Sequence, residues 1–537
     1  MTRIEGHAGQ QTIAALQQFG TDVMFTLNGA HIWPFYDAAR DRGMRVVDTR
    51  HEQSAAFAAE AYAKLTRRPG LAALTAGPGV TNGISAVTSA MFNGAPLVVL
   101  GGRAPEGRWG AGSLQEFDHV PVLAPITKLA TTVKQAELAG EIVHGAATLA
   151  ASPHRGPVFL DFPFDLFAPT EGEVPDGGAD LSPAADPAAI TRLAELVARA
   201  ERPAFLVGSD AYWDGAWTEL EAAASALGVP CFFNGLGRGM LPADHPHAFL
   251  RTRGVLKQRA DLVVVIGTPL DFRVGFGSFG DAAVAHVVDA ESQAARHVDV
   301  TTVAGDIAVT LAGLADHVGD RVDHSGWLGE LRDAEEAARA QEEPLLDADD
   351  PSIKPTRIYG ELRKRLERDA IVICDGGDFV SYAGKYVETY QPGCWLDTGP
   401  YGCLGNGMGY AVAARTVHPD RQVVVMLGDG AAGFSLMDVD SLVRHGLPVV
   451  MVVGNNGIWG LEKHPMQMIY GWDMACDLQP ETRYDEVVTA LGGAGETVTS
   501  PDQIGPALDR AFASGVPYLV NVMTDPSDIY PRSSNLA

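Results

Sequence analysis

The amino-acid sequence predicts an α/β protein of three domains, each a doubly wound parallel sheet covered by helices on both faces. One observation is length, because 537 residues exceed what a single hydrophobic core normally supports. A second is the alternation of short β-branched runs with helix-length segments, which is typical of strand–helix–strand units. A third is the 60 glycines, which suit many tight turns between strands and helices.

Short apolar runs are predicted to be buried strands, and two segments of different composition are predicted to separate the domains. The strands are residues 97–102, 157–162, 204–208, 262–267, 370–377, 423–430 and 449–456. The separating segments, 168–187 and 341–356, are rich in Pro, Gly, Asp and Glu and lack apolar periodicity. The predicted domains are therefore residues 1–167, 188–340 and 357–537.

Net charge and cysteine content disfavour several classes of protein. Forty basic against 67 acidic residues give a formal charge of −27, which disfavours binding to nucleic acid or to an anionic membrane. The five cysteines form no Cys-x-x-Cys pair and are too few for a disulfide framework, which fits a reducing compartment. We recognise neither a signal peptide nor a run of ~18 apolar residues. We therefore expect a cytoplasmic enzyme without nucleic-acid or membrane partners.

Residues 71–102 and 423–456 carry a weak internal repeat. In both, an apolar strand meets a Gly-x-Gly turn, a helix follows, and a Gly-x-Pro step opens the next strand. From Gly77 to Pro96 is 19 positions and from Gly428 to Pro448 is 20, so the two units could superimpose. Two interpretations stay open: a duplicated unit, or a likeness that any two βαβ units share.

Asp429 lies between Gly428 and Gly430, directly after a predicted strand. The carboxyl end of a parallel strand next to a helix N-terminus favours an anion such as a diphosphate. A carboxylate would repel that anion unless Mg²⁺ lay between them. The next strand ends at Asn455-Asn456, and adjacent parallel strands of a βαβ unit end on the same side, so Asn456 is a second candidate ligand. The alternative is a helix cap at Asp429 and an ordinary turn at the asparagines.

The run Gly428-Asp429-Gly430, 24 intervening residues and Asn455-Asn456 resembles the binding signature of enzymes that use thiamine diphosphate (ThDP). The resemblance covers essentially the whole chain, in the group of acetolactate synthase, pyruvate oxidase, benzaldehyde lyase and oxalyl-CoA decarboxylase. It implies a pyrimidine-binding N-terminal domain, a central domain and a diphosphate-binding C-terminal domain. It also implies metal ligation by Asp429, Asn456 and the carbonyl of Ile458, and cofactor contacts from Glu52, Gly402, Leu404, Gly428, Asp429, Gly430, Ala431 and Asn456.

Two catalytic residues follow from the same resemblance. The segment 50–62 matches the part of the family that carries a glutamate, which implies that Glu52 bonds the pyrimidine nitrogen N1′ and activates the cofactor. Its alternative is a surface glutamate in the first turn of a helix. In segment 399–414, the position that is often Met in relatives is Leu404, an apolar wedge that bends the cofactor. Its alternative is ordinary core packing.

Substrate-side residues are implied in the same way. Segment 113–128 resembles the loop that carries a glutamine facing the reacting centre, hence Gln115. Asn28–Ile32 is closer to benzaldehyde lyase, in which a residue matching His31 relays protons, a role suited to imidazole near neutral pH. The pocket is predicted from Ala30, His31, Gln115, Phe164, Trp459 and Leu461. Structural packing is the alternative for each, and His51 and His464 carry the same ambiguity.

The chain also departs from the family pattern. Typical acetolactate synthases carry a Gln-Trp pair downstream of the asparagines, whereas residues 462–465 are Glu-Lys-His-Pro, which questions strict specificity for 2-oxo acids. Segments 237–246, 267–277 and 286–291 resemble those that hold FAD or ADP in relatives. The Met-His segment that helps to hold flavin is replaced by Arg-Thr-Arg-Gly at 251–254. FAD therefore stays open, with a structural role.

The leading hypothesis is an acetolactate-synthase-like carboligase that uses ThDP and Mg²⁺. It would decarboxylate pyruvate or a related 2-oxo acid and join the product to a second carbonyl compound, an aldehyde or 2-oxo acid, as in branched-chain amino acid biosynthesis. The alternatives are a lyase of the benzaldehyde lyase or 2-hydroxyacyl-CoA lyase type and a non-catalytic ThDP-binding protein, which the presence of Glu52 disfavours. The resemblance further implies a homodimer or homotetramer with active sites between subunits.

Overall fold

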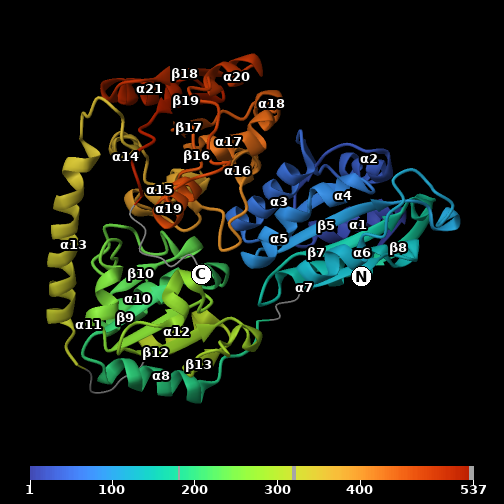
Figure 1. Cartoon of the computed structure of the whole chain (residues 1–537). Helices are drawn as coiled ribbons and strands as arrows, with labels where there is room; N and C mark the ends of the chain where they lie inside the picture. Colours follow the sequence, from blue (N-terminus) through green and yellow to red (C-terminus); the bar gives the residue numbers. More distant parts are fainter. Residues whose placement is uncertain (179–181, 317–321, 531–537) are drawn as a thin grey trace.

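The computed structural model describes residues 1–178, 182–316 and 322–530, which form three α/β domains (Figure 1). The N-terminal sheet has the order β3-β2-β4-β5-β7-β6, the central sheet β10-β9-β11-β12-β13 and the C-terminal sheet β15-β14-β16-β17-β19-β18. Every strand pair within these three sheets is parallel. The predicted fold class is confirmed. The C-terminal segment 531–537 lies outside the described residues.

The N-terminal domain ends in a strand that pairs back with the first strand of the chain. β8 pairs antiparallel with β1, so the first predicted separating segment, 168–187, includes an ordered strand. The elements of this domain are β1 (Thr2–Gly6), α1 (Ala8–Gln17), β2 (Val23–Thr26), α2 (Trp33–Asp41), β3 (Arg45–Asp48), α3 (Glu52–Thr66), β4 (Gly70–Leu74), α4 (Pro78–Asn82), α5 (Ile84–Phe92), β5 (Leu97–Arg103), α6 (Val120–Leu123), β6 (Leu129–Thr132), α7 (Ala139–Ala151), β7 (Val158–Pro163) and β8 (Thr170–Val174).

The central domain is followed by one long helix, α13, which runs along the edge of the molecule toward the C-terminal domain (Figure 1). The second predicted separating segment, 341–356, therefore begins inside a helix. The elements are α8 (Pro187–Arg199), β9 (Pro203–Val207), α9 (Ser209–Trp213), α10 (Trp217–Leu227), β10 (Cys231–Phe233), α11 (Leu256–Arg259), β11 (Leu262–Ile266), β12 (Ala283–Val288), β13 (Thr301–Ala304), α12 (Ile307–Ala315) and α13 (Ser325–Leu346).

The C-terminal domain breaks one helix that the sequence predicted as continuous. Leu436, Val439 and Val443 keep helical spacing in the sequence, but Leu436 lies in a 3₁₀ turn (Leu436–Asp438), and Val439 and Val443 lie in a separate short helix, α18, after α17. The elements are α14 (Pro355–Arg363), β14 (Ile371–Asp375), α15 (Gly377–Tyr386), β15 (Trp395–Leu396), α16 (Asn406–Val417), β16 (Val423–Gly428), α17 (Asp429–Ser435), α18 (Val439–Arg444), β17 (Val450–Asn455), α19 (Gly460–Tyr470), α20 (Tyr484–Ala490), β18 (Ala494–Val498), α21 (Pro501–Ala513) and β19 (Tyr518–Met523).

The predicted strands are present, and their composition explains their place. Each predicted run coincides, within two residues at either end, with β5, β7, β9, β11, β14, β16 or β17. These strands are buried on both faces, as in β11, where every residue is buried. Parallel strands covered by helices on both sides are therefore continuous apolar runs.

The N-terminal and C-terminal sheets share one topology. When the six strands of each sheet are numbered by their order in the sequence, both sheets have the spatial order 2-1-3-4-6-5. The repeated segments predicted from sequence are the third and fourth strands of each sheet, and each pair is joined by two short helices. This correspondence supports the interpretation as a duplicated unit.

Helices α3 and α16 pack the N-terminal domain against the C-terminal domain (Figure 1). A Cβ on Gly409 would lie 2.6 Å from Ser54 O, so only glycine permits this approach. Lys64, which is 2% exposed, donates to Tyr410 Oη at 2.7 Å and pairs with Glu60 at 2.8 Å. The interface is thus closely packed and carries a buried ion pair.

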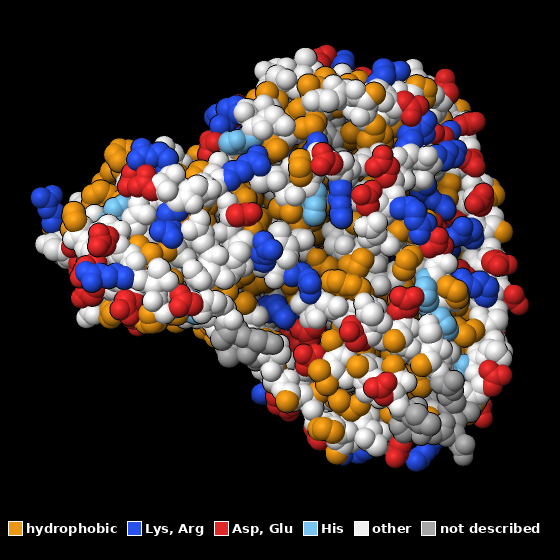
Figure 2. Space-filling model, turned by 180° about the vertical axis from the view of Figure 1, so that it is seen from behind, with side chains coloured by type: hydrophobic (Ala, Val, Ile, Leu, Met, Phe, Trp, Pro, Cys, Tyr) orange, Lys and Arg blue, Asp and Glu red, His pale blue; other side chains and the backbone are white. Residues whose placement is uncertain are grey.

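The surface is acidic overall but mixed in sign. On the face drawn in Figure 2, Asp and Glu are interspersed with Lys and Arg, and no extended patch of one sign is visible. Across residues 1–178, 182–316 and 322–530, no helix combines the length and apolar character needed to cross a bilayer.

Candidate active site

Asp429 lies where the sequence predicted it, at the carboxyl end of a buried strand. β16 ends immediately before Asp429, and the adjacent parallel strand β17 ends at Asn455. Asp429 Oδ2 accepts a hydrogen bond of 2.6 Å from Gly457 N, and Oδ1 accepts one of 2.8 Å from Gly430 N. This carboxylate therefore joins the two strand ends.

The surroundings of Asp429 suit a cation. Burial raises the pKa of Asp429 to about 6, although the amides of Gly457 and Gly430 oppose the shift. No Lys, Arg or His among the described residues forms an ion pair with this carboxylate, so its charge has no side-chain counterion. Asn456 lies on the adjoining turn, where its Oδ1 accepts from Ile458 N at 3.2 Å. Carboxylate and amide oxygens are ligands that Mg²⁺ prefers, so these residues fit a divalent cation.

A second carboxylate, Asp378, faces the same place and was missed by sequence reasoning. A Cβ on Gly460 would lie 2.6 Å from Asp378 Oδ2 and 3.7 Å from Asn456 Nδ2. Burial raises the pKa of Asp378, its charge raises that of Asp429, and His464 acts on Asp378 in the opposite direction. The buried Nε2 of His464 has no hydrogen-bond partner among the described residues. The one signal in the sequence was the position of Asp378 directly after a predicted strand.

The loop that carries Gly402 and Leu404 is held at its end by a buried carboxylate. Gly402 is exposed with φ 68°, and Leu404 is half-buried. Asp375 accepts hydrogen bonds from Gly405 N at 3.0 and 3.1 Å and from Gly407 N at 2.9 Å. Burial raises the pKa of Asp375 to about 7 despite these bonds. The carboxylate thus sets the direction of the chain between Leu404 and α16.

Glu52 is a buried residue, not a surface one. It begins α3 and is 8% exposed. The helix is capped by His51, whose Nδ1 accepts from Gln53 N at 3.1 Å. Glu52 Oε2 accepts from Asn82 Nδ2 at 3.0 Å, and Oε1 lies 3.7 Å from a Cβ built on Gly79. The carboxylate therefore faces α4, the short helix that follows the turn after β4, and His51 takes the structural role left open in the sequence.

His31 and Gln115 lie beside that same turn. His31 is 9% exposed, and its Nδ1 is 3.5 Å from Thr75 Oγ1. Burial lowers the pKa of His31, and His119 lowers it further. Gln115 is half-buried with φ 57°, and a Cβ on Gly77 would lie 3.0 Å from its Cβ. The loop of Gln115 and the turn after β4 are therefore in contact.

A buried chain of hydrogen bonds supports this turn, and sequence reasoning assigned it no role. Gly77 N donates to His119 Nε2 at 2.9 Å, and His119 Nδ1 is 3.1 Å from Asp161 Oδ1. Because a backbone N–H can only donate, the imidazole proton is on Nδ1 and is donated to Asp161. Arg103 donates to the other oxygen of Asp161 at 2.9 Å. His119 lay in the segment that predicted Gln115, but only the fold brings Asp161 beside it.

The predicted pocket residues divide between the two flanking domains. Phe164 is 41% exposed, and its ring centroid is 6.4 Å from that of His31, while Ala30 is exposed next to His31. Trp459 packs against the turn of Asp429, and Leu461 packs against the start of α15.

The site residues fall into two groups, one around Glu52 and one around Asp429. The glutamate group comprises Ala30, His31, Glu52, Thr75, Gly77, Gln115 and Phe164, and the aspartate group comprises Asp378, Asp429, Gly430, Ala431, Asn456, Ile458, Trp459 and Leu461.

The two groups belong to different domains and are not bonded to each other within one chain. Next to Glu52, a hydrogen bond of 3.3 Å from Gln53 Nε2 to Leu404 O joins the two domains. Among the described residues, no hydrogen bond or ion pair joins the side chains of the glutamate group to those of the aspartate group. The predicted site residues therefore form two half-sites.

Three family models match this chain, in the order of its three sheets. The N-terminal TPP-binding domain of thiamine pyrophosphate enzymes matches residues 6–122, the central domain 190–314 and the C-terminal TPP-binding domain 375–522. This chain belongs to the thiamine pyrophosphate enzyme family. Thiamine pyrophosphate is another name for ThDP, so the resemblance inferred from the sequence is confirmed. The two half-sites lie in its two ThDP-binding domains, except for Phe164, which lies outside the first matched segment, 6–122.

Relatives of full length narrow the comparison within the family. The chain is 50% identical over 540 residues to acetolactate synthase large subunit IlvG of Mycobacterium tuberculosis and to a probable acetolactate synthase of Mycobacterium bovis, covering 99% of this chain and 98% of each relative. It is 32% identical over 576 residues to 2-hydroxyacyl-CoA lyase 2 of Homo sapiens, covering 97% of this chain and 90% of the relative. Both functions predicted from the sequence are thus represented among its relatives.

Proposed function

We propose that this thiamine pyrophosphate enzyme is a carboligase of the acetolactate synthase type, which decarboxylates pyruvate or a related 2-oxo acid and joins the product to a second carbonyl compound. One observation carries the proposal. A chain that is 50% identical over its whole length to an acetolactate synthase large subunit has a half-site in each of its two ThDP-binding domains. A buried Glu52 lies in one ThDP-binding domain, and the other contains a buried Asp429 for which the described residues supply no counterion.

Mg²⁺ fits the aspartate group, with Asp429, Asn456 and the carbonyl of Ile458 as its ligands. The cation would offset the cost of burying the Asp429 charge and would bind the diphosphate of ThDP. Asp378, the second carboxylate of the aspartate group, would add negative charge beside the cation. When bound, ThDP supplies the carbanion chemistry that breaks and makes carbon–carbon bonds.

The chain's own residues orient the reactants and move protons. Glu52 would bind the pyrimidine ring of ThDP through a carboxylate that Asn82 orients. His31, whose pKa is lowered by burial, is neutral near pH 7 and can accept a proton from the substrate. Gln115 would contact the substrate, and Leu404 would support the cofactor.

The active site is completed by a second copy of the chain. Among the described residues of one chain, the half-sites are not bonded to each other, and each is bordered by exposed apolar side chains that a partner could cover. Those in or beside the glutamate group are Trp33, Leu114, Phe117 and Phe164, and those of the C-terminal domain are Phe434, Met437, Met468, Ile469, Tyr470, Trp472 and Met474. A homodimer or homotetramer follows from this arrangement.

Mixing two inactive variants tests the shared site. In a dimer of Glu52→Gln with Asp429→Ala, one site carries both substitutions and the other carries neither. Equal mixing and reassembly should restore about a quarter of the wild-type sites. Light scattering checks the oligomeric state. No recovery from a mixture shown to form heterodimers, or full activity in a monomer, would contradict a shared site.

Pyruvate turnover tests the reaction. The purified protein with ThDP, Mg²⁺ and pyruvate should release carbon dioxide and form acetolactate, and chelation of the metal should stop both. An otherwise folded protein that binds ThDP and turns over no 2-oxo acid would remove the carboligase assignment.

A lyase for 2-hydroxyacyl-CoA or 2-hydroxy ketones is the second candidate. It is favoured by His31 beside the glutamate group and by Glu-Lys-His-Pro at 462–465 in place of Gln-Trp. If the protein is such a lyase, it should cleave a 2-hydroxyacyl-CoA and leave pyruvate unchanged.

We also propose that the protein is cytoplasmic, which is supported by five cysteines that are all unpaired.

A further inference from the structure

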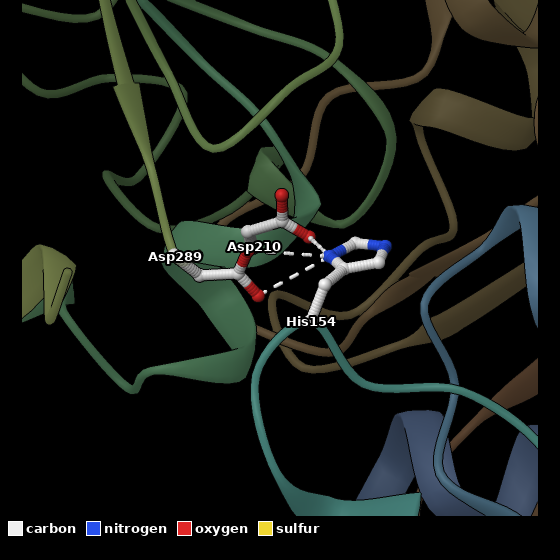
Figure 3. A group of neighbouring side chains, drawn as sticks. All are labelled: His154, Asp210 and Asp289. Carbon is white, nitrogen blue, oxygen red and sulfur yellow. Dashed lines mark hydrogen bonds and ion pairs between the residues drawn. The ribbon is translucent and has the colours of Figure 1, made fainter. Parts of the chain in front are cut away.

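A histidine of the N-terminal domain inserts between two carboxylates of the central domain (Figure 3). His154 Nδ1 lies 3.2 and 3.3 Å from the two oxygens of Asp289 and 3.5 Å from Asp210 Oδ1. Figure 3 shows Nδ1 directed at both carboxylates and Nε2 directed away from them. Asp210 is 4% exposed and Asp289 1%, so the contact is buried.

The place of this contact in the fold is the one that nucleotides use in open parallel sheets. Asp210 follows β9 and Asp289 follows β12, and these strands flank β11 in the middle of the central sheet. Ligands of such sheets bind in the crevice outside the carboxyl ends of the strands. Here that crevice receives the side chain of His154, which comes from the loop after α7.

The charges around His154 are nearly balanced when its imidazole is protonated. Arg155 donates to Asp214 at 2.9 Å and lies 4.0 Å from Asp289, and Lys128 Nζ donates to His154 O at 2.7 Å. With Asp210, three carboxylates therefore face three cations. A divalent metal in place of the proton would leave an excess of positive charge.

Protonation of His154 is favoured by its neighbours. Burial alone would lower its pKa, but Asp210 and Asp289 raise it to about 9, with Lys128 opposing them. Burial also raises the pKa of Asp210, with a contribution from Asp289. Buried charges are tolerated when they are paired, so the cluster forms an ion-pair bridge between two domains.

The same geometry is unsuited to a dinucleotide. A diphosphate at the end of β9 would meet the carboxylate of Asp210, and the ribose would find Asp289 already paired with His154. The glycines after the strands give no open cradle. A Cβ on Gly208 would lie 2.1 Å from Thr268 Oγ1, and one on Gly267 would lie 2.5 Å from Ala211 N.

The segment that replaces the flavin-binding Met-His is also committed to internal contacts. Arg251 has a side chain that is 2% exposed and pairs with Glu342 at 2.7 Å, Glu388 at 3.1 Å and Glu335 at 3.2 Å. Thr252 donates to Glu335 at 3.0 Å. These bonds attach the segment to α13 and to the C-terminal domain.

We propose that His154 closes the nucleotide crevice of the central domain by an interdomain ion pair, so that this enzyme binds no FAD. The residues of the crevice do not fit the flavin that the sequence left open. The domain contributes instead a fixed connection between the N-terminal and central domains.

Flavin content tests the proposal without reference to activity. The full-length protein, purified with and without incubation in excess FAD and then desalted, is heated, and the released flavin is measured against protein. We expect no stoichiometric flavin in either preparation and no effect of FAD on turnover. One FAD retained per chain would overturn the proposal.

Thermal unfolding tests the ion pair. His154→Gln and Asp289→Asn should each lower the melting temperature by several degrees, and the double variant should lower it little further, because both remove one interaction. His247→Gln is the control, because His247 is a half-buried histidine of the central domain that pairs with no carboxylate in the described part of the chain. Fully additive losses, or none, would contradict the ion pair.

The stabilisation that His154 contributes should depend on pH with a defined sign. The folded pKa of His154, about 9, exceeds its ordinary 6.5, so its stabilisation is complete below about 6.5 and is lost as pH rises through about 9. The difference in melting temperature between wild type and His154→Gln should shrink across that range. Saturable stabilisation of the wild type by Zn²⁺ or Mn²⁺ that Asp210→Asn abolishes would show a metal in place of the proton and overturn the proposal.

Discussion

The N-terminal and C-terminal domains have the same strand order but place different chemistry at equivalent positions. The third strand is β4 in one and β16 in the other, and the helix before it is α3 in one and α16 in the other. The turn after β16 carries Asp429, whereas the turn after β4 carries Gly77. The first residue of α3 is Glu52, whereas α16 begins directly after a loop whose end is held by Asp375.

The difference teaches how two domains of the same topology can divide one task. The turn after β16 in the C-terminal domain offers oxygen ligands for a cation. The turn after β4 in the N-terminal domain offers packing and hydrogen bonds behind a single carboxylate, that of Glu52. The equivalent helices α3 and α16 pack on each other, so the two domains meet through corresponding faces. If the C-terminal domain anchors the cofactor and the N-terminal domain activates it, as proposed, substitutions in the two half-sites should have different effects.

Glu52→Gln should have the largest effect, because it removes the activating carboxylate but keeps its shape. We expect kcat to fall by about 10²–10⁴-fold, while ThDP still binds through the aspartate group. Steady-state kinetics and a fluorescence titration with ThDP measure the two quantities. Glu141→Gln, on the exposed first turn of α7, is the matched control. Loss of binding without a specific loss of kcat would assign Glu52 to anchoring.

Asp429→Asn should give the opposite result, with cofactor affinity as the main loss. Removing one charged ligand should weaken Mg²⁺-dependent binding of ThDP by about 10²-fold, measured by calorimetry. Saturating cofactor should then recover part of the turnover. If affinity were unchanged, the two half-sites would not differ in the way described.

The raised pKa of Asp429 adds a pH dependence to that prediction. Because the metal needs the carboxylate, Mg²⁺ affinity should fall by up to about tenfold per pH unit below about 6. The metal-free protein should lose stability as pH rises from 3.8 toward about 6, since its buried carboxyl favours the protonated form. Mg²⁺ should cancel that loss, and Asp429→Asn should show neither effect.

Leu404→Ala should affect turnover more than substrate binding. A lost support under the cofactor rings should lower kcat by about tenfold, with KM nearly unchanged. Leu366→Ala, another half-buried leucine of the C-terminal domain, is the control. Unchanged turnover would leave Leu404 as ordinary packing.

His119→Ala should have the smallest effect, because it acts through Gly77 and Gln115. We expect kcat/KM to fall several-fold, and His119→Gln should restore part of it, since an amide oxygen can accept from Gly77 N. Asp161→Asn should resemble the alanine variant, whereas Asp118→Asn, an exposed neighbour of Arg103, should not. An equal loss in all four would indicate general destabilisation.

Local signals in the chain were enough for most of the fold and for the residues that follow strands directly. Apolar runs predicted β5, β16 and β17 closely, since burial on both faces leaves no polar positions. Asp429 and Asn456 could be paired from sequence because neighbouring parallel strands end together. The break after α17 was not predicted, because Leu436, Val439 and Val443 keep helical spacing across a 3₁₀ turn.

Residues that act across distant segments could not be predicted in this way. Asp161 reaches His119, Asp375 reaches Gly405, and His154 reaches Asp289 only after the sheets have formed. None of these pairs has a fixed spacing, and each residue type is common in ordinary turns and helix ends.

The sequence by itself determined the family and the three sheets, and it indicated Asp429, Asn456 and Glu52 as candidate site residues, because strand burial and strand-end chemistry are local properties of a chain. The tertiary structure decided which buried charges are paired. Asp429 has no cationic partner within residues 1–178, 182–316 and 322–530, whereas Asp210 and Asp289 receive His154 from another domain. The physical reason is that the cost of burying a charge depends on what the rest of the fold places within a few ångströms of it.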